Sequence, residues 1–263
     1  MDLGLKGRTA FVAAASKGLG RAIADDLAEE GVDLFLCARG KEALDKTCEE
    51  IARRTGVRVE GMTADVSNEE EARSVVRAAI ARFGKIDILV TNAGGPPSGR
   101  FETLTPEMWR EAVDLTLMSV VNLTSEVVPG MKERKWGRII NVTSIAVKQP
   151  VDGLMLSNSL RSAVTGFAKT LSNEVARHGI TVNCMLPGYT RTERVDQLSQ
   201  AAAKREGITS EAATARWESE IPAGRLGEPR EFGALAAFLA SERASFITGT
   251  SIQVDGGWTK GLL

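Results

Sequence analysis

Short apolar runs alternate with helix-length amphipathic segments along the whole chain of 263 residues. Strands separated by helices of this length are expected to run parallel, with right-handed crossovers that put helices on both faces of one sheet. We therefore predict an α/β fold in a single domain, residues 1–263, built on a doubly wound, Rossmann-like parallel sheet of about seven strands. The expected strands are residues 9–13, 32–38, 57–62, 86–91, 138–143, 180–186 and 250–254, and the expected helices are 21–30, 41–54, 69–83 (capped by Ser67), 106–134, 153–177, 197–220 and 229–240.

Small residues and two glycines connect the first expected strand to the first expected helix. A helix that opens directly after such a turn offers unpaired N–H groups and a partial positive charge to an anion. Small residues also let the backbone approach a pyrophosphate closely. Ala14 stands where a dinucleotide-binding turn usually has glycine, and we expect it to hold the turn with a negative φ. The predicted phosphate turn comprises Ala14, Ser16, Lys17, Gly18, Leu19 and Gly20, and a plain strand-to-helix connection with incidental glycines is the alternative.

Small or polar residues follow each of the first six expected strands. The carboxyl ends of parallel strands share one edge of the sheet, and a doubly wound sheet binds its ligand beyond that edge. This repeated coincidence predicts nucleotide binding more specifically than any single motif does. The positions are 16–20, Arg39, Asp65, Asn92-Ala93-Gly94, Ser144 and Pro187-Gly188.

The end of the second expected strand indicates which dinucleotide is bound. A site selective for NAD usually carries an acid there, on the ribose 2′-hydroxyl. This chain has Arg39 instead, whose guanidinium suits a 2′-phosphate, and Lys17 is a second cation within reach. We therefore predict NADP(H), with Asp65 accepting from the adenine amino group and Val66 beside the ring. A solvated loop at Arg39 and a simple helix cap at Asp65 are the alternatives.

Composition excludes several classes of function. Lys and Arg total 33 against 34 Asp and Glu, which gives no electrostatic case for nucleic acid or a membrane surface. No apolar run approaches the roughly 20 residues of a membrane helix, and the N-terminus has no signal-peptide pattern. Cys37, Cys48 and Cys184 lack metal-ligand spacing, so we expect no metal site and the reduced thiols of a cytoplasmic protein. His178, the only histidine, is expected to lie at a helix end.

Three motifs resemble those of the classical short-chain dehydrogenase/reductase family, and the likeness extends over essentially the whole chain. They are Thr91-Asn-Ala-Gly94, Gly137-Arg-Ile-Ile-Asn-Val-Thr-Ser144 and Gly179-Ile-Thr-Val-Asn-Cys-Met-Leu-Pro-Gly188. The branch most similar to the chain is the 3-oxoacyl-acyl-carrier-protein reductases. The resemblance implies an NADP(H)-dependent oxidoreductase acting on a small-molecule carbonyl or thioester substrate. It also implies that 91–94 support the cofactor ribose and that the loop with Pro187, Gly188, Thr190 and Thr192 holds the carboxamide or the phosphates.

The active-site positions depart from that family. Its members use Asn, Ser, Tyr and Lys, and the family's spacing places these on Thr116, Ser144, Ser157 and Arg161, so that only the serine is retained. A phenol near a cation can protonate an alkoxide, whereas a serine hydroxyl is a far weaker acid. Arg161 cannot relay a proton, but it can bind ribose hydroxyls and stabilise developing negative charge. The one tyrosine, Tyr189, follows the sixth strand and could reach the substrate; a packing role is the alternative.

Three interpretations of this site remain open. The first is an NADP(H)-dependent oxidoreductase that protonates its substrate by a changed route, for example through a water held by Ser144, Ser157 and Arg161. The second is a catalytically impaired relative that binds NADP(H) as a sensor or scaffold. The third is a cofactor-independent lyase or dehalogenase-like relative. The polar replacements, with Ser159 expected on the same helix face, favour the first interpretation.

The remaining predictions concern the substrate pocket and assembly. Residues 190–220 are expected to form a lid-like helical segment, with Trp217 lining the pocket. By analogy with the family, the C-terminal strand and the helices at 106–134 and 153–177 imply a homotetramer or homodimer. Met118, Val121, Val127 and Phe167 are candidates for that interface or for the intramolecular core.

Overall fold

One parallel sheet of seven strands, in the order β3-β2-β1-β4-β5-β6-β7, forms the centre of the molecule. The computed structural model describes residues 2–262. The chain runs outward from β1 in one direction and then from β4 in the other, so the strand order reverses between these two neighbours. The predicted doubly wound fold is confirmed. The strands are β1 Thr9–Ala13, β2 Asp33–Ala38, β3 Val59–Thr63, β4 Ile88–Thr91, β5 Gly137–Val142, β6 Ile180–Pro187 and β7 Ser251–Val254.

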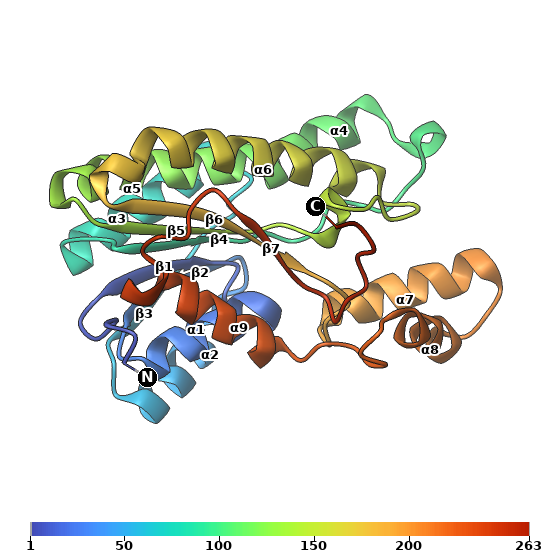
Figure 1. The fold of residues 1–263 in the computed structure, drawn as a ribbon, viewed down its shortest axis with the longest axis horizontal. Coiled ribbons are helices and arrows are strands. Elements are labelled where there is room, and N and C mark those ends of the chain that lie inside the picture. Colours follow the sequence, from blue (N-terminus) through green and yellow to red (C-terminus); the bar gives the residue numbers. More distant parts are fainter. Residues whose placement is uncertain (1, 263) are drawn as a thin grey trace.

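Helices cover both faces of this sheet (Figure 1). Helices α3, α5 and α6 pack on one face, and α1, α2 and α9 pack on the other, because each helix turns an apolar stripe toward a strand surface. The central strands β1 and β4 are buried along their whole length, as their uninterrupted apolar runs predict. The helices are α1 Gly18–Glu29, α2 Lys41–Thr55, α3 Glu69–Phe83, α4 Pro106–Val113, α5 Ser119–Arg134, α6 Met155–Val175, α7 Glu193–Glu206, α8 Ser210–Glu220 and α9 Pro229–Ala240.

The expected helix at residues 106–134 is two helices. A π-helical turn, Asp114–Met118, separates α4 from α5 and carries Thr116. Thr105 caps α4, and Pro106 stands in its first turn. The cap of α3 is Asn68, whose side chain accepts from the Glu71 amide; the prediction of Ser67 was wrong by one residue.

The expected helix at 197–220 also divides in two. Helix α7 begins earlier than predicted, at Glu193, and ends at Glu206, directly before Gly207, whose φ of 70° is left-handed and so favours glycine. Helix α8 follows and packs against α7 around a small apolar cluster with Val195, Trp217 and Ile221. The pair lies to one side of the sheet, beyond the carboxyl end of β6 (Figure 1).

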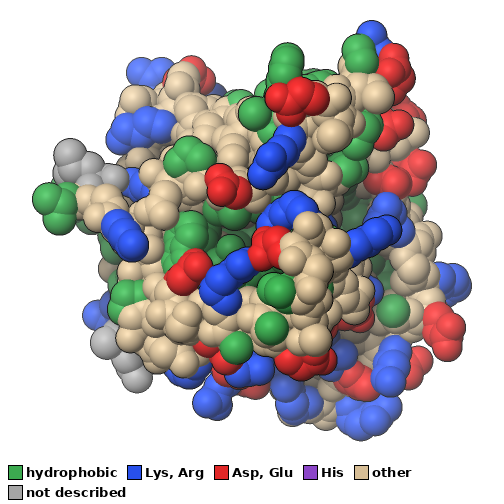
Figure 2. Space-filling view, turned by 90° about the vertical axis from the view of Figure 1, so that its right-hand side faces the viewer, with side chains coloured by type: hydrophobic (Ala, Val, Ile, Leu, Met, Phe, Trp, Pro, Cys, Tyr) green, Lys and Arg blue, Asp and Glu red, His purple; other side chains and the backbone are tan. Residues whose placement is uncertain are grey.

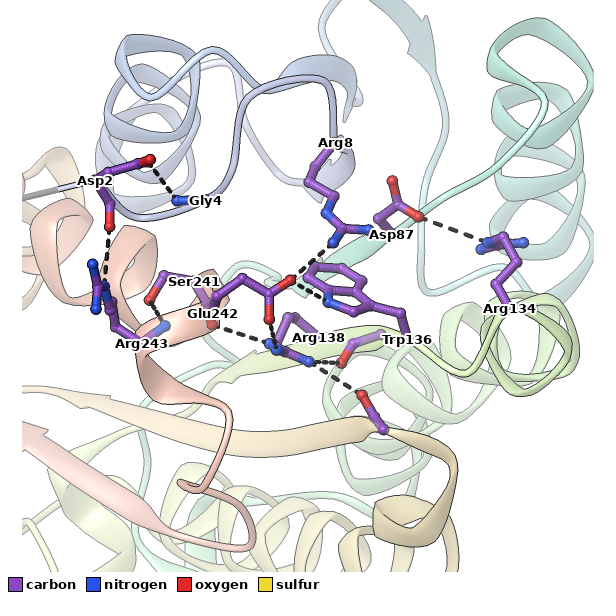
Figure 3. Close-up of polar contacts among 12 residues, drawn as sticks. Asp2, Gly4, Arg8, Asp87, Arg134, Trp136, Arg138, Ser241, Glu242 and Arg243 are labelled. Atoms are coloured by element: carbon purple, nitrogen blue, oxygen red, sulfur yellow. Dashed lines mark hydrogen bonds and ion pairs between the residues drawn. The ribbon is translucent and has the colours of Figure 1, made fainter.

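The amino-terminal edge of the sheet is held by a polar cluster centred on Glu242 (Figure 3). Its carboxylate accepts hydrogen bonds from Arg8 (2.9 Å) and from the Trp136 indole N–H (2.8 Å), and lies 3.6 Å from Arg138. Arg138, on β5, is only 2% exposed. Burial lowers the pKa of the Arg138 guanidinium, and Glu242 acts in the opposite direction. The cluster therefore links β5 to the segment after α9. It lies at the amino ends of the strands, whereas the predicted nucleotide site lies at their carboxyl ends.

Replacing Glu242 with alanine is expected to lower the free energy of unfolding by about 1–3 kcal/mol, because it leaves a buried guanidinium without its carboxylate. Urea denaturation followed by circular dichroism measures this loss. Glu133→Ala is the control, since Glu133 is exposed and has no ion pair within residues 2–262; it should change stability by less than about 0.5 kcal/mol. Equal stability of the two variants would contradict the assigned role of Glu242.

Within residues 2–262, helix length, the cysteines and the lone histidine bear on the expectations from composition. No helix there is long and apolar enough to cross a bilayer. Cys37, Cys48 and Cys184 are unpaired, and no group of metal-ligating side chains is found in the part of the chain that the structure describes. His178 ends a short 3₁₀ turn between α6 and Gly179, as expected of a helix-end residue.

Candidate active site

The turn between β1 and α1 leaves the start of α1 open to a ligand. Gly20 is buried, and a Cβ atom there would lie 2.3 Å from the Ala14 carbonyl oxygen and 2.9 Å from Asn92 Nδ2. Only glycine therefore allows this close approach of helix to strand. The cap residue Lys17 supplies no side-chain acceptor, so the first N–H groups of α1 stay without a cap. A pyrophosphate is the kind of group that fits this arrangement.

Ala14 differs from its prediction. Its φ is 50°, in the left-handed region, whereas we expected a negative φ. The turn requires a left-handed residue at this point because the chain must reverse out of β1 toward Gly18, whose φ is 60°. An alanine there costs about 1–2 kcal/mol of backbone strain, which glycine would avoid.

The expected adenosine end of the site lies beyond β2 and β3. Arg39 is largely exposed, and its Nη1 atom lies 4.0 Å from Asp65 Oδ2. The other oxygen of Asp65 accepts hydrogen bonds from the Ser67 amide (3.0 Å) and hydroxyl (2.7 Å), a turn in the loop that precedes the Asn68 cap of α3. The neighbouring Val66 is buried. No carboxylate stands at the end of β2, so the residues fit a 2′-phosphate better than a free 2′-hydroxyl.

Lys17 does not point toward Arg39. Its ammonium forms an ion pair with Glu193, the first residue of α7, and both side chains are exposed. Thr192 lies directly before α7, and its methyl group is the nearest neighbour of a Cβ built on Gly18. The loop after β6, with Gly188 and the buried Thr190, therefore lies next to the predicted phosphate turn.

The residues after β4 share a small pocket with the predicted catalytic positions. Asn92, Ala93, Thr116 and Arg161 all line it. Thr116 is buried, and its hydroxyl has no hydrogen-bond partner within residues 2–262. An unpartnered buried hydroxyl is costly, so the π-helical turn holds a polar group ready for a ligand or water.

Arg161 is positioned from α6 and reaches across to the end of β5. Its Nη1 atom donates to the carbonyls of Val142 (2.9 Å) and Thr143 (3.0 Å), directly before Ser144. Burial, reinforced by nearby Arg194, lowers the pKa of the Arg161 guanidinium to about 10. The group is therefore still cationic at neutral pH, next to the retained serine.

The two candidate serines belong to different elements, and neither is among the residues that line the pocket. Ser144 is half-buried, and its hydroxyl accepts from the Ala146 amide (3.1 Å). Ser157 lies one turn before Arg161 on α6, is 8% exposed, and shares a helix face with Arg161 and Val164, which line the pocket. Ser159 is exposed on another face, so the prediction that it joins the cleft was wrong.

Tyr189 occupies a different environment. Its ring stacks on Trp217 with centroids 4.5 Å apart and meets Trp258 edge-on at 5.9 Å. Burial raises the pKa of the Tyr189 phenol to about 12, which makes it a weaker acid than a free tyrosine. This position corresponds to the packing alternative, in the apolar cluster beneath α7 and α8.

One residue of the site was not anticipated. Arg194, on α7, donates from Nη2 to the Pro96 carbonyl (3.2 Å), so it reaches the segment after β4. The only local signal is its place two residues after Thr192. Figure 2 views this end of the molecule and shows a recess with apolar side chains inside it and Lys or Arg side chains across it.

Comparison with known proteins agrees with this geometry. A family model described as enoyl-(acyl carrier protein) reductase matches residues 13–259. The chain belongs to the short-chain dehydrogenase/reductase family. It is 36% identical over 250 residues to a putative ketoacyl reductase of Streptomyces coelicolor, covering 94% of this chain and 95% of that protein. It is 35% identical over 255 residues to a 3-oxoacyl-[acyl-carrier-protein] reductase of Vibrio cholerae, covering 97% and 98%.

Solved structures of short-chain dehydrogenases/reductases superpose closely on the chain. The L-sorbose reductase of Gluconobacter frateurii, solved with NADPH and L-sorbose, has a TM-score of 0.94 and 34% identity, with 100% of both chains covered. An actinorhodin polyketide ketoreductase variant solved with NADPH has a TM-score of 0.92 and 35% identity, covering 97% and 98%. The chain is thus an oxidoreductase of this family.

Proposed function

We propose that the chain is an NADP(H)-dependent reductase that transfers hydride to or from a carbonyl or alcohol substrate, similar to 3-oxoacyl-acyl-carrier-protein reductases but with an atypical active site. The observation that carries the proposal is the start of α1, where Gly20 allows a close approach to β1 and no side chain caps the first N–H groups. Arg39, with no carboxylate at the end of β2, adds to it. NADPH-bound relatives of the same fold support the choice of cofactor.

The predicted cofactor residues divide along this edge of the sheet. The phosphate turn would hold the pyrophosphate, Arg39 the 2′-phosphate, and residues 92–94 with Arg161 the nicotinamide ribose. Residues 187, 188, 190 and 192 would border the carboxamide. When bound, reduced NADP supplies the hydride.

The chain's own residues would stabilise the negative charge on the substrate oxygen and position the proton donor. Ser144 would donate to the substrate oxygen, and Arg161 would stabilise negative charge that develops on it. Neither Ser157 nor Arg161 is an acid near neutral pH, so the proton would come from a water held between Ser144 and Ser157, with Thr116 as a further hydroxyl.

Calorimetric titration with NADPH and NADP⁺, followed by NADPH-absorbance assays on ketones and 3-oxoacyl thioesters, tests the proposal. Binding with turnover supports it. Absence of binding to both nucleotides would overturn it. Binding without any turnover would identify the second candidate, an impaired relative acting as sensor or scaffold, which the packed position of Tyr189 favours. The preserved phosphate turn argues against a cofactor-independent lyase.

Arg39→Asp is expected to weaken NADPH binding about 10–100-fold and to leave NADH binding unchanged or stronger, because a 2′-phosphate would face a carboxylate. Calorimetry with both cofactors measures the two affinities. Arg177→Asp makes the same charge change at an exposed position next to the amino end of β6 and should alter neither affinity. If both variants weakened NADPH binding equally, the loss of affinity would come from the change in net charge and not from a contact of Arg39.

We further propose that α7 and α8 form a lid over the substrate and that the protein is a cytoplasmic homotetramer. The separate apolar cluster of α7 and α8 supports the lid. For assembly, Met118, Val121 and Phe167 are partly exposed, whereas Val127 is buried in the core and is not available to a partner. Light scattering on the purified protein tests the tetramer, with a homodimer as the alternative outcome.

A further inference from the structure

Two arginines of the cleft have no acidic partner. Within residues 2–262, Arg161 and Arg194 are the only arginines that combine partial burial with the absence of a carboxylate at ion-pair distance. The other arginines that lack a carboxylate in that part of the chain are exposed to solvent: Arg53, Arg100, Arg177, Arg230 and Arg243.

The two guanidinium groups lie at opposite ends of the segment that follows β4. Arg161 lines the pocket beside Asn92 and Ala93, at the start of that segment. Arg194 donates to Pro96 at its other end. A Cβ atom on Gly95 would lie 2.5 Å from Arg194 Nη2, so glycine at this position makes room for the guanidinium. The segment is therefore shaped around the second cation.

Uncompensated cations in a confined site favour an incoming anion. Burial lowers the pKa of Arg194. The pKa of Arg161 is lowered by burial first and then by repulsion from the charge of Arg194. Backbone carbonyls satisfy some of the N–H groups, but no side-chain carboxylate of residues 2–262 neutralises either charge. The planar fork of arginine is suited to a carboxylate, which it can bind through two hydrogen bonds.

We propose that the substrate is an oxo acid whose carboxylate binds the guanidinium of Arg194, with Arg161 as a second cation nearby, and whose ketone is directed to Ser144. This inference rests on the proposed function and narrows its substrate class. In the reduction, the ketone carbon gains hydride from NADPH and the oxygen gains a proton that bound water passes on from bulk solvent, which yields a hydroxy acid and NADP⁺.

The test compares each acid with its uncharged ester. The probes are acetoacetate with methyl acetoacetate, and 2-oxobutanoate with methyl 2-oxobutanoate. Calorimetry measures their binding to the protein alone and with NADP⁺, and NADPH absorbance gives kcat and KM. We expect at least one acid to bind about 100-fold more tightly than its ester, the gain from two charge-assisted contacts.

Arg194→Gln should raise the KM or Kd of that acid about 10–100-fold and leave those of the ester and NADPH within about twofold. Arg194→Lys should restore part of the affinity. Arg191→Gln is the matched control, because Arg191 lies three residues earlier, in the loop before α7, and is already paired with Glu218 and Glu228. It should leave binding of the acid unchanged.

Three results would overturn the inference. These are equal binding of acid and ester, an Arg194→Gln variant that binds the acid normally, and an Arg194→Gln variant that loses NADPH affinity instead, which would assign the cation to the cofactor. All three leave the proposed function intact. Failure to bind NADPH would reject that function. Calorimetry of the acids and esters with the protein alone would still show whether the arginines bind a carboxylate.

Discussion

Gly20→Ala is expected to weaken NADPH binding by more than about 100-fold. The added Cβ would lie 2.3 Å from the Ala14 carbonyl oxygen, so the start of α1 must move away from β1. A displacement of about 1 Å is enough to misplace the N–H groups that face the pyrophosphate. The same strain should lower the free energy of unfolding by about 1–3 kcal/mol. Calorimetry and urea denaturation measure the two effects.

Gly166→Ala is the matched control for this variant. Gly166 is also inside an α-helix, α6, but a Cβ there would have no neighbour within 4 Å. Alanine should therefore stabilise the fold by about 0.5–1 kcal/mol and leave cofactor affinity unchanged. If Gly20→Ala stayed folded and bound NADPH as tightly as Gly166→Ala, the turn after β1 would not be the phosphate site.

The double variant Ser157→Tyr with Arg161→Lys is expected to raise kcat for ketone reduction about 100-fold, the usual contribution of a positioned general acid. Positions 157 and 161 are one turn apart on α6, so the introduced ammonium would lie beside the introduced phenol and lower its pKa. Reduction needs the protonated phenol, so the gain should be present at neutral pH and fall as pH rises through that pKa.

Ser157→Phe with Arg161→Lys separates acidity from volume. Its ring fills the same space without a hydroxyl, so it should show no gain in kcat and no loss at high pH. Equal rates for the phenol and phenyl variants would contradict a missing proton donor as the reason for slow turnover. Single-turnover measurements with NADPH in excess keep product release from masking the chemical step.

The sheet and its polar edge were predictable because they depend on local patterns. Each buried strand is an apolar run, and each loop at the carboxyl edge begins where that run stops, as at Thr91-Asn92. The break at Asp114–Met118 was not predictable in the same way. A π-helical turn inserts about one residue into an otherwise continuous helical periodicity, and packing decides whether it forms.

Candidate site residues could be predicted only where a motif or a spacing within one segment of the sequence points to them. The family's spacing led to Ser144, Ser157 and Arg161 without any tertiary information. Arg194 was missed because its contact with Pro96 joins segments far apart in sequence, and because α7 was expected to begin only at residue 197. The left-handed φ of Ala14 was missed for a related reason: alanine gives no sign of it, and the geometry of the turn imposes it.

The ion pair between Lys17 and Glu193 has a consequence for how nucleotide enters. It joins the proposed phosphate turn to the first residue of α7, so an arriving pyrophosphate would compete with a carboxylate for the same ammonium. Added salt would loosen this tether and at the same time screen the attraction of the dinucleotide to the turn. The two effects oppose each other, so the association rate should depend less on ionic strength than the charges of the ligand alone would dictate.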